Sequence, residues 1–100
     1  MGESERSRAL AAKLRERLEA LHVEVDDESH LHAGHAGAAG GGGHFRALIV
    51  SARFEGQSTL ESQRMVYAAL AEEMRSSIHA LAMQTLTPGQ WQARAPADSA

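Results

Sequence analysis

Hydrophobic and polar positions alternate with regular periods in several segments of the chain. Between residues 5 and 21 leucines recur at spacings of four, four and three, which places them on one stripe of a helix with charged residues opposite. The leucines are Leu10, Leu14, Leu18 and Leu21. Ser4 stands where it can cap the first turn. The pattern predicts an amphipathic helix from Glu5 to Leu21.

Two further segments have the patterns of strands. Residues 22–25 alternate, so that Val23 and Val25 face one way. Residues 44–54 are almost continuously apolar, which is typical of a central strand covered on both faces. We therefore expect these two segments to pair in one sheet.

Two helices are predicted in the second half of the chain. The first begins at Ser58, where a glutamate three positions later completes the form of a capping box, and runs to about Arg75 with Val66 on its buried side. The second is a short helix that carries Trp91. It begins with another capping box at residues 87–90, with proline at the first helical position.

Residues 78–85 alternate in polarity and predict a third strand, with His79 and Leu81 on one face and Ile78 on the other. The order of elements is then helix, strand, strand, helix, strand, helix. A hairpin followed by a crossover helix and a third strand gives a mixed three-stranded sheet. We expect an α+β fold with the helices on one face of this sheet.

The length of 100 residues allows one domain with a single small core. We expect residues 1–94 to form this domain and residues 95–100 to be a disordered tail. Residues 30–43 contain six glycines and show no periodicity. Glycine is costly to order, so this segment is predicted to be a flexible loop within the domain.

Composition and charge exclude several classes of protein. Apolar runs never reach the roughly 18 residues that cross a bilayer, so no membrane span is expected. No secretory signal is recognised, which favours the cytoplasm. The chain has no cysteine, which excludes disulfides, thiolate nucleophiles and cysteine-built zinc sites. No motif indicates a catalytic site or a small-molecule substrate, so we do not expect an enzyme.

Six histidines are the unusual feature of the composition, and four of them lie within fifteen positions. These four are His30, His32, His35 and His44. The first three lie in the glycine-rich loop, where their spacing suits metals but is only weakly specific, so solvated side chains are the alternative. His44 opens the central strand, where a structural or supporting role is expected. His79 is either a hydrogen-bonded histidine of the sheet or a metal ligand.

Histidine ligands constrain the kind of metal site that this chain can form. Iron–sulfur clusters normally need four thiolates, and two imidazoles can replace two of them on one iron. A chain without cysteine therefore cannot hold such a cluster alone. A histidine pair is useful only if another molecule supplies sulfur ligands. Because imidazole must lose its proton to bind, mild acid should release the metal.

Several short motifs, in the same order along nearly the whole chain, resemble those of the BolA-like proteins. They are DES (27–29) followed by His32, GHFR (43–46), VSARFEG (50–56), QRMVY (63–67), LAEE (70–73), IHALA (78–82) and TPGQW (87–91). Each motif is weak alone, but together they cover about residues 10–92. One position departs from the family pattern: Gln63 stands where a histidine commonly precedes the arginine.

The resemblance implies a fold like that of class II KH domains and a partnership with a monothiol glutaredoxin. In that family the two proteins share a [2Fe-2S] cluster, for which the glutaredoxin and a glutathione supply thiolates. The BolA-like partner supplies one ligand from the glycine-rich loop and one from the histidine of the third strand. These ligands correspond to His32 and His79 here, and His35 is an alternative loop ligand beside His30.

DNA binding is the alternative function, because the family includes transcriptional regulators. Arg46, Arg53 and Arg64 are the candidate contacts. Two features weigh against tight binding: residues 54–57 have one glycine and a carboxylate where KH folds have Gly-x-x-Gly, and residues 44–75 carry four basic and four acidic side chains. A scaffold that binds proteins without any metal is a third possibility.

Overall fold

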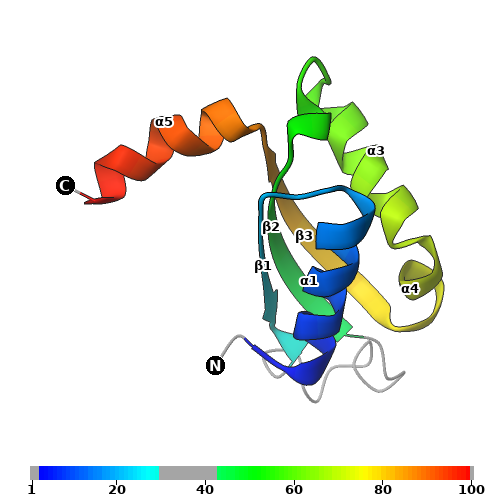
Figure 1. Ribbon diagram of the computed structural model, residues 1–100. Coiled ribbons are helices and arrows are strands. Elements are labelled where there is room, and N and C mark those ends of the chain that lie inside the picture. The colour runs from blue at the N-terminus through cyan, green and yellow to red at the C-terminus, as the bar shows by residue number, and fades with distance from the viewer. Residues whose placement is uncertain (1–2, 30–42, 100) are drawn as a thin grey trace.

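The computed structural model describes residues 3–29 and 43–99 and has the predicted α+β architecture (Figure 1). The elements are α1 (Glu5–Arg17), β1 (His22–Asp27), β2 (Gly43–Val50), the short 3-10 helix η2 (Ala52–Phe54), α3 (Thr59–Ala69), α4 (Ala71–Ser76), β3 (Ile78–Leu86) and α5 (Pro88–Ser99). None of the helices in this described part of the chain is long and apolar enough to cross a bilayer.

The sheet is mixed and three-stranded, in the order β1-β2-β3. β1 pairs antiparallel with β2, with Val23 opposite Ile49. β2 pairs parallel with β3, with Phe45 opposite Leu81. A parallel pair needs a crossover connection, and the α3–α4 segment supplies it.

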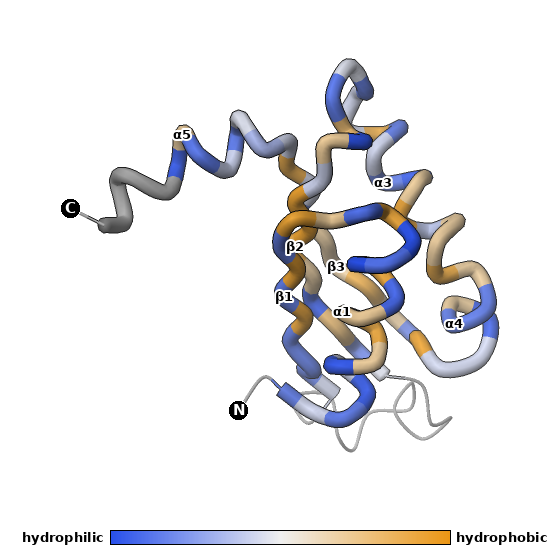
Figure 2. The backbone as a smooth tube through the Cα atoms, viewed as in Figure 1, coloured by the Kyte–Doolittle hydropathy of each residue, from blue (hydrophilic) through white to orange (hydrophobic). Residues whose placement is uncertain are grey.

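One face of the sheet is covered by α1 and α3 (Figure 1). The buried core residues from these helices and the sheet are Leu10, Leu14, Leu18, Val23, Val25, Phe45, Ala47, Ile49, Phe54, Val66, Leu70 and Ile78. The predicted burial of Val23 and Val25 on one face is confirmed. Figure 2 shows the apolar positions concentrated on the strands and on the sides of the helices near them.

The first helix ends earlier than the leucine spacing predicted. α1 stops at Arg17, and Glu19 then adopts a left-handed backbone conformation with φ 50°. That conformation terminates a helix. Leu21 therefore lies outside the helix and is 67% exposed, so its predicted place on the buried stripe was wrong.

The central strand also differs from the prediction. β2 ends at Val50, because the Ser51 hydroxyl donates to the carbonyl of Leu18 (2.7 Å) and accepts the backbone N–H of Arg53, which starts the η2 turn. The prediction that both faces are covered was wrong. Arg46 is exposed and Leu48 is only half-buried on the face away from α1.

The predicted crossover helix is divided into α3 and α4 at Leu70, whose backbone leaves the helical region (φ −111°, ψ 25°). The Leu70 side chain is fully buried. After this break α4 brings Glu73 to Lys13 of α1, with which it forms an ion pair. Ser58 accepts the N–H of Glu61 at 3.0 Å, as a cap should.

The terminal helix α5 runs to Ser99, so it is longer than the short helix that the sequence predicted. Its capping box is present: Thr87 and Gln90 exchange hydrogen bonds between their backbone N–H groups and side chains. Trp91 stacks on His22 with ring centroids 4.7 Å apart. This contact ties the start of α5 to β1.

Candidate functional site

A β-bulge sets the position of His79. Gly43 pairs with Ile78, but His44 pairs with Ala80, so that His79 is one extra residue in β3. Ile78 belongs to the core, and Leu81, three residues later, also packs against it. The prediction that Leu81 and Ile78 face opposite ways was therefore wrong, because the extra residue changes the phase of the strand. His79 is exposed to solvent.

His44 lies beside His79 in the structure. Their ring centroids are 5.0 Å apart, and the ring planes are tilted by 43°. The backbone of His44 is held on both sides, since its N–H donates to the Ser29 hydroxyl (3.1 Å) and its carbonyl accepts the N–H of Glu28 (2.7 Å). The pair thus combines an accessible imidazole with a half-buried, anchored one. A metal role for either residue stays a prediction.

Asp27 connects the start of α1 to Ser29, the last residue before the glycine-rich segment. Its carboxylate accepts the Ser4 hydroxyl (2.6 Å) and the N–H of Ser29 (2.9 Å). Burial raises the pKa of Asp27, but the hydrogen bonds from Ser29 and Ser4 and the charge of Arg6 outweigh it and hold this pKa below its ordinary value. Sequence reasoning missed this role, although an aspartate two residues before a serine N–H is a recognisable turn signal.

Gly43 is the last glycine of the glycine-rich segment and begins β2, where a close approach of two side chains requires glycine. A Cβ atom at this position would lie 2.4 Å from Cε2 of Phe45 and 2.7 Å from a guanidinium nitrogen of Arg6. Arg6 also stacks over the Phe45 ring and donates to the carbonyl of Ser77 at 2.8 Å. The Gly43 N–H donates to the same carbonyl at 2.9 Å.

The predicted loop ligands His30, His32 and His35 lie outside the described residues. The attachment points of their segment are placed, however, by the contacts of Ser29 and Gly43. Both points border the His44–His79 pair. Within residues 3–29 and 43–99 no group of three or more histidine, cysteine, aspartate or glutamate side chains could hold a metal ion. Further ligands would have to come from elsewhere.

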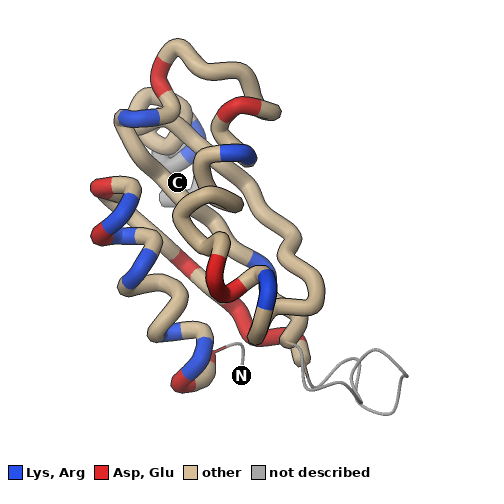
Figure 3. Tube along the Cα trace, turned by 90° about the vertical axis from the view of Figure 1, so that its right-hand side faces the viewer, with Lys and Arg blue, Asp and Glu red and all other residues tan. Residues whose placement is uncertain are grey.

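The three arginines proposed as DNA contacts lie on three different elements, and each faces a carboxylate. Arg46 pairs with Glu28 (3.1 Å), Arg53 with Glu19 (3.0 Å) and Arg64 with Glu61 (3.9 Å). Figure 3 shows acidic and basic positions interspersed along the described trace. These three ion pairs neutralise positive charge that would otherwise attract the phosphates of DNA.

Comparisons with known proteins agree on one family. The model of the family described as BolA-like protein matches residues 14–90. Human BolA-like protein 1 is 45% identical over 91 residues, which cover 91% of this chain and 64% of the human protein. The Escherichia coli protein named DNA-binding transcriptional regulator BolA is 41% identical over 80 residues, which cover 80% of this chain and 73% of that protein. The chain thus spans less than two thirds of the human relative's length.

Solved structures show the same architecture. The solution structure of mouse BolA1 superposes with a TM-score of 0.73 at 42% identity, covering 93% of this chain and 73% of the mouse chain. The BolA domain of SufE1 from Arabidopsis thaliana gives a TM-score of 0.74 at 36% identity, covering 87% and 96%. The fold predicted from the sequence is therefore confirmed.

Proposed function

Because the chain belongs to the BolA-like protein family, we propose that it is a non-enzymatic adaptor that binds a monothiol glutaredoxin and shares a [2Fe-2S] cluster with it. The observation that carries the proposal is the exposed imidazole of His79, which lies beside Gly43, the residue that follows the histidine-rich segment. The glutaredoxin and a glutathione would supply the sulfur ligands that this cysteine-free chain lacks.

The residues present fit such a shared cluster. Imidazole nitrogen is an established ligand for iron, and two histidines on one iron leave the other iron to thiolates. His79 and one loop histidine, His32 or His35, would hold the cluster from this side. When bound, the cluster supplies one-electron redox chemistry.

His44 would support this arrangement by holding the neighbouring ring in place. Its anchored backbone and its contact with His79 restrict where the His79 side chain can turn. Orientation of a ligating histidine by a neighbour is a general feature of metal sites. Because imidazole binds metal only when it is deprotonated, the shared cluster should be released in mild acid.

The test is anaerobic reconstitution with a monothiol glutaredoxin, glutathione, iron and sulfide, followed by visible absorption and circular dichroism. We expect a spectrum distinct from that of the glutaredoxin alone, and we expect His79→Ala and one of the loop variants, His32→Ala or His35→Ala, to lose it. His22→Ala is the matched control, because His22 is engaged with Trp91 and Glu24. A spectrum unchanged in all these variants would show that the histidines are not ligands.

DNA binding is the second candidate, favoured by the name of the Escherichia coli relative. A titration against duplex DNA at two salt concentrations tests it, because phosphate contacts give a steep salt dependence. If Arg53 contributes, Arg53→Ala should weaken binding. The absence of binding at low salt would reject this candidate for the chain alone.

A further inference from the structure

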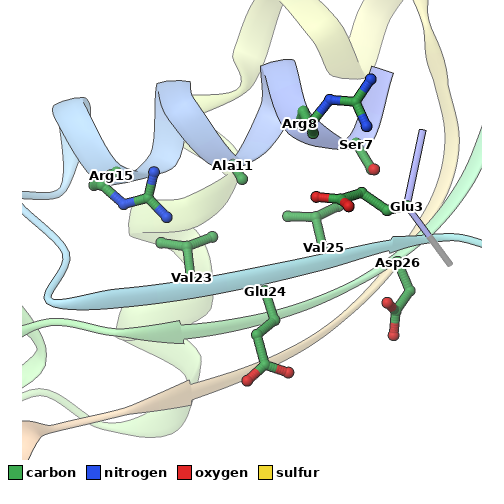
Figure 4. Close-up of a pocket in the computed structure, with 9 residues that line it drawn as sticks. All are labelled: Glu3, Ser7, Arg8, Ala11, Arg15, Val23, Glu24, Val25 and Asp26. Carbon is green, nitrogen blue, oxygen red and sulfur yellow. The ribbon is translucent and has the colours of Figure 1, made fainter. Parts of the chain in front are cut away.

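A groove lies between α1 and β1, with a volume of about 630 Å³ (Figure 4). Val23 and Val25 of β1 line it from below, and Arg8 and Arg15 of α1 line it from above. Figure 4 shows the Glu24 side chain on the far side of the strand, away from α1. Asp26 also points away from α1, so the charged side chains on the α1 side of the strand are those of Arg8, Arg15 and Glu3.

The strand that borders this groove has a free edge. Among the strands of residues 3–29 and 43–99, β1 is outermost and pairs only with β2. The Glu28 N–H donates to the carbonyl of His44, so even-numbered residues of β1 direct their backbone groups toward β2. The alternate residues Val23 and Val25 then direct their N–H and C=O groups outward. An unpaired edge of this kind is a template for another strand.

Arg8 and Arg15 differ from the other basic residues of the same helix. Lys13 and Arg17 both reach Glu73. The side chains of Arg8 and Arg15 have no ion-pair or hydrogen-bond partner in the described part of the chain, and both are exposed. They are seven positions, or about two helical turns, apart. Two uncompensated guanidinium groups thus flank the free edge.

We propose that this groove binds an extended, acidic segment of a partner protein, which adds as a fourth strand along β1. Backbone hydrogen bonds to Val23 and Val25 would give affinity, and carboxylates at alternate positions of the added strand would pair with Arg8 and Arg15. Alternate residues on one face of a strand are about 6.8 Å apart, within reach of both flexible arginines.

Glu3 sets a direction for this segment. It lines the end of the groove near Asp26, where Figure 4 shows its carboxylate on the same side of the strand as Arg8. Because Glu3 repels a carboxylate at that end, the added strand should pair more strongly with Arg15 than with Arg8.

A second copy of β1 is a poorer occupant of the edge. It would place valines under the arginines and bring Glu24 and Asp26 close to their own counterparts on the opposite face, where like charges repel. The groove is also separate from His79, since β1 and β3 are the two opposite edges of the sheet. The proposal therefore does not depend on the metal role of that histidine.

The probe is a short synthetic peptide in which glutamate alternates with threonine, titrated into the isotope-labelled full chain. We expect the amide resonances of Val23 and Val25 to shift most. Two versions of this peptide are compared, one with N-methyl groups on its odd-numbered amides and the other with N-methyl groups on its even-numbered amides. Strand addition predicts that only one version binds, because only one set of amides faces β1. Equal binding by both versions, or shifts centred elsewhere, would overturn the proposal.

Charge variants test whether the two arginines contribute to binding of the peptide. The double substitution Arg8→Ala with Arg15→Ala should weaken binding about tenfold, as two exposed ion pairs are lost. Arg75→Ala removes an exposed charge from α4 and should leave affinity unchanged. The Arg8→Lys with Arg15→Lys protein should retain most of the affinity. A peptide that does not bind, or a double alanine variant that binds like wild type, would reject an acidic partner. Self-association of the chain through β1 would also reject the proposed acidic partner.

Discussion

The two faces of the sheet contrast most clearly within β2. Phe45, Ala47 and Ile49 point to the face under α1 and α3 and are almost completely buried. Arg46 and Leu48 alternate with them and are exposed or half-buried on the other face. The same eight-residue strand thus has a closed side and an open side.

The covered face of the sheet contributes most to the stability of the fold, and the open face carries the side chains proposed to bind other molecules. The covered face holds the apolar contacts that hold the helices to the sheet. The open face and its rim hold exposed side chains that other molecules can reach, and His79 is one of them. Substitutions on the two faces should therefore have different consequences.

The largest difference is expected between two neighbouring residues of β2. Ile49→Ala should lower the free energy of unfolding by about 2–5 kcal/mol, because it leaves a cavity in a fully buried site. Leu48→Ala should cost about 1 kcal/mol, since part of that side chain is already in water. Denaturant unfolding of both variants measures the contrast. Equal losses would mean that the second face is also covered in solution.

A smaller loss is expected at Gly43, where the two strands begin their irregular pairing. Gly43→Ala should cost about 1–3 kcal/mol, because the added Cβ must displace the buried Phe45 ring. Gly89→Ala is the matched control in α5. Its nearest neighbour would be the Thr87 hydroxyl at 3.9 Å, so alanine there should be neutral or stabilising. If both substitutions behave alike, the close packing around Gly43 is not significant.

Local patterns were sufficient to predict most of the fold. Helix caps such as the one at Ser4, the stripe of leucines in α1 and the alternation of Val23 and Val25 all depend on neighbours a few positions away, so the sequence shows them directly. These signals gave the order of elements and the α+β class.

The details of the candidate site depend on contacts that no local pattern contains. The extra residue at His79 follows from how β3 meets Gly43, thirty-six positions earlier in the chain. Likewise, Arg53 meets Glu19 across the fold, which no charge count over one segment could show. The alternating polarity of residues 78–85 predicted a regular strand, because the single extra residue of a bulge produces no recognisable pattern in the sequence.

The covered side should also respond to acid through Glu73. The hydrogen bond from Lys13 holds the pKa of Glu73 below its ordinary value of 4.5, and it outweighs burial, which acts in the opposite direction. The unfolded chain therefore takes up a proton first as the pH falls. The stability from this pair is complete above pH 4.5 and is lost as the pH falls through the pKa of the folded state.

Lys13→Met tests this linkage. It should lower stability at neutral pH by about 1–2 kcal/mol, since it removes the main partner of a buried carboxylate. It should also flatten the decline of stability below pH 4.5. Arg75→Met, on the same helix as Glu73, should change neither quantity. Unfolding curves measured across this pH range provide the comparison. If the free energy of unfolding of Lys13→Met falls below pH 4.5 as steeply as that of the wild type, other carboxylates cause the decline.

The smallest effect on stability is expected at His79. His79→Ala removes an exposed ring whose main neighbour is another imidazole, so the free energy of unfolding should change by about 0.5 kcal/mol or less. The same substitution should abolish the shared cluster in reconstitution. A loss of stability comparable to that of Ile49→Ala would instead make His79 a structural residue. If His79→Ala loses the cluster but keeps its free energy of unfolding, His79 acts in binding and not in folding. We expect this outcome because the open face contributes little to the core.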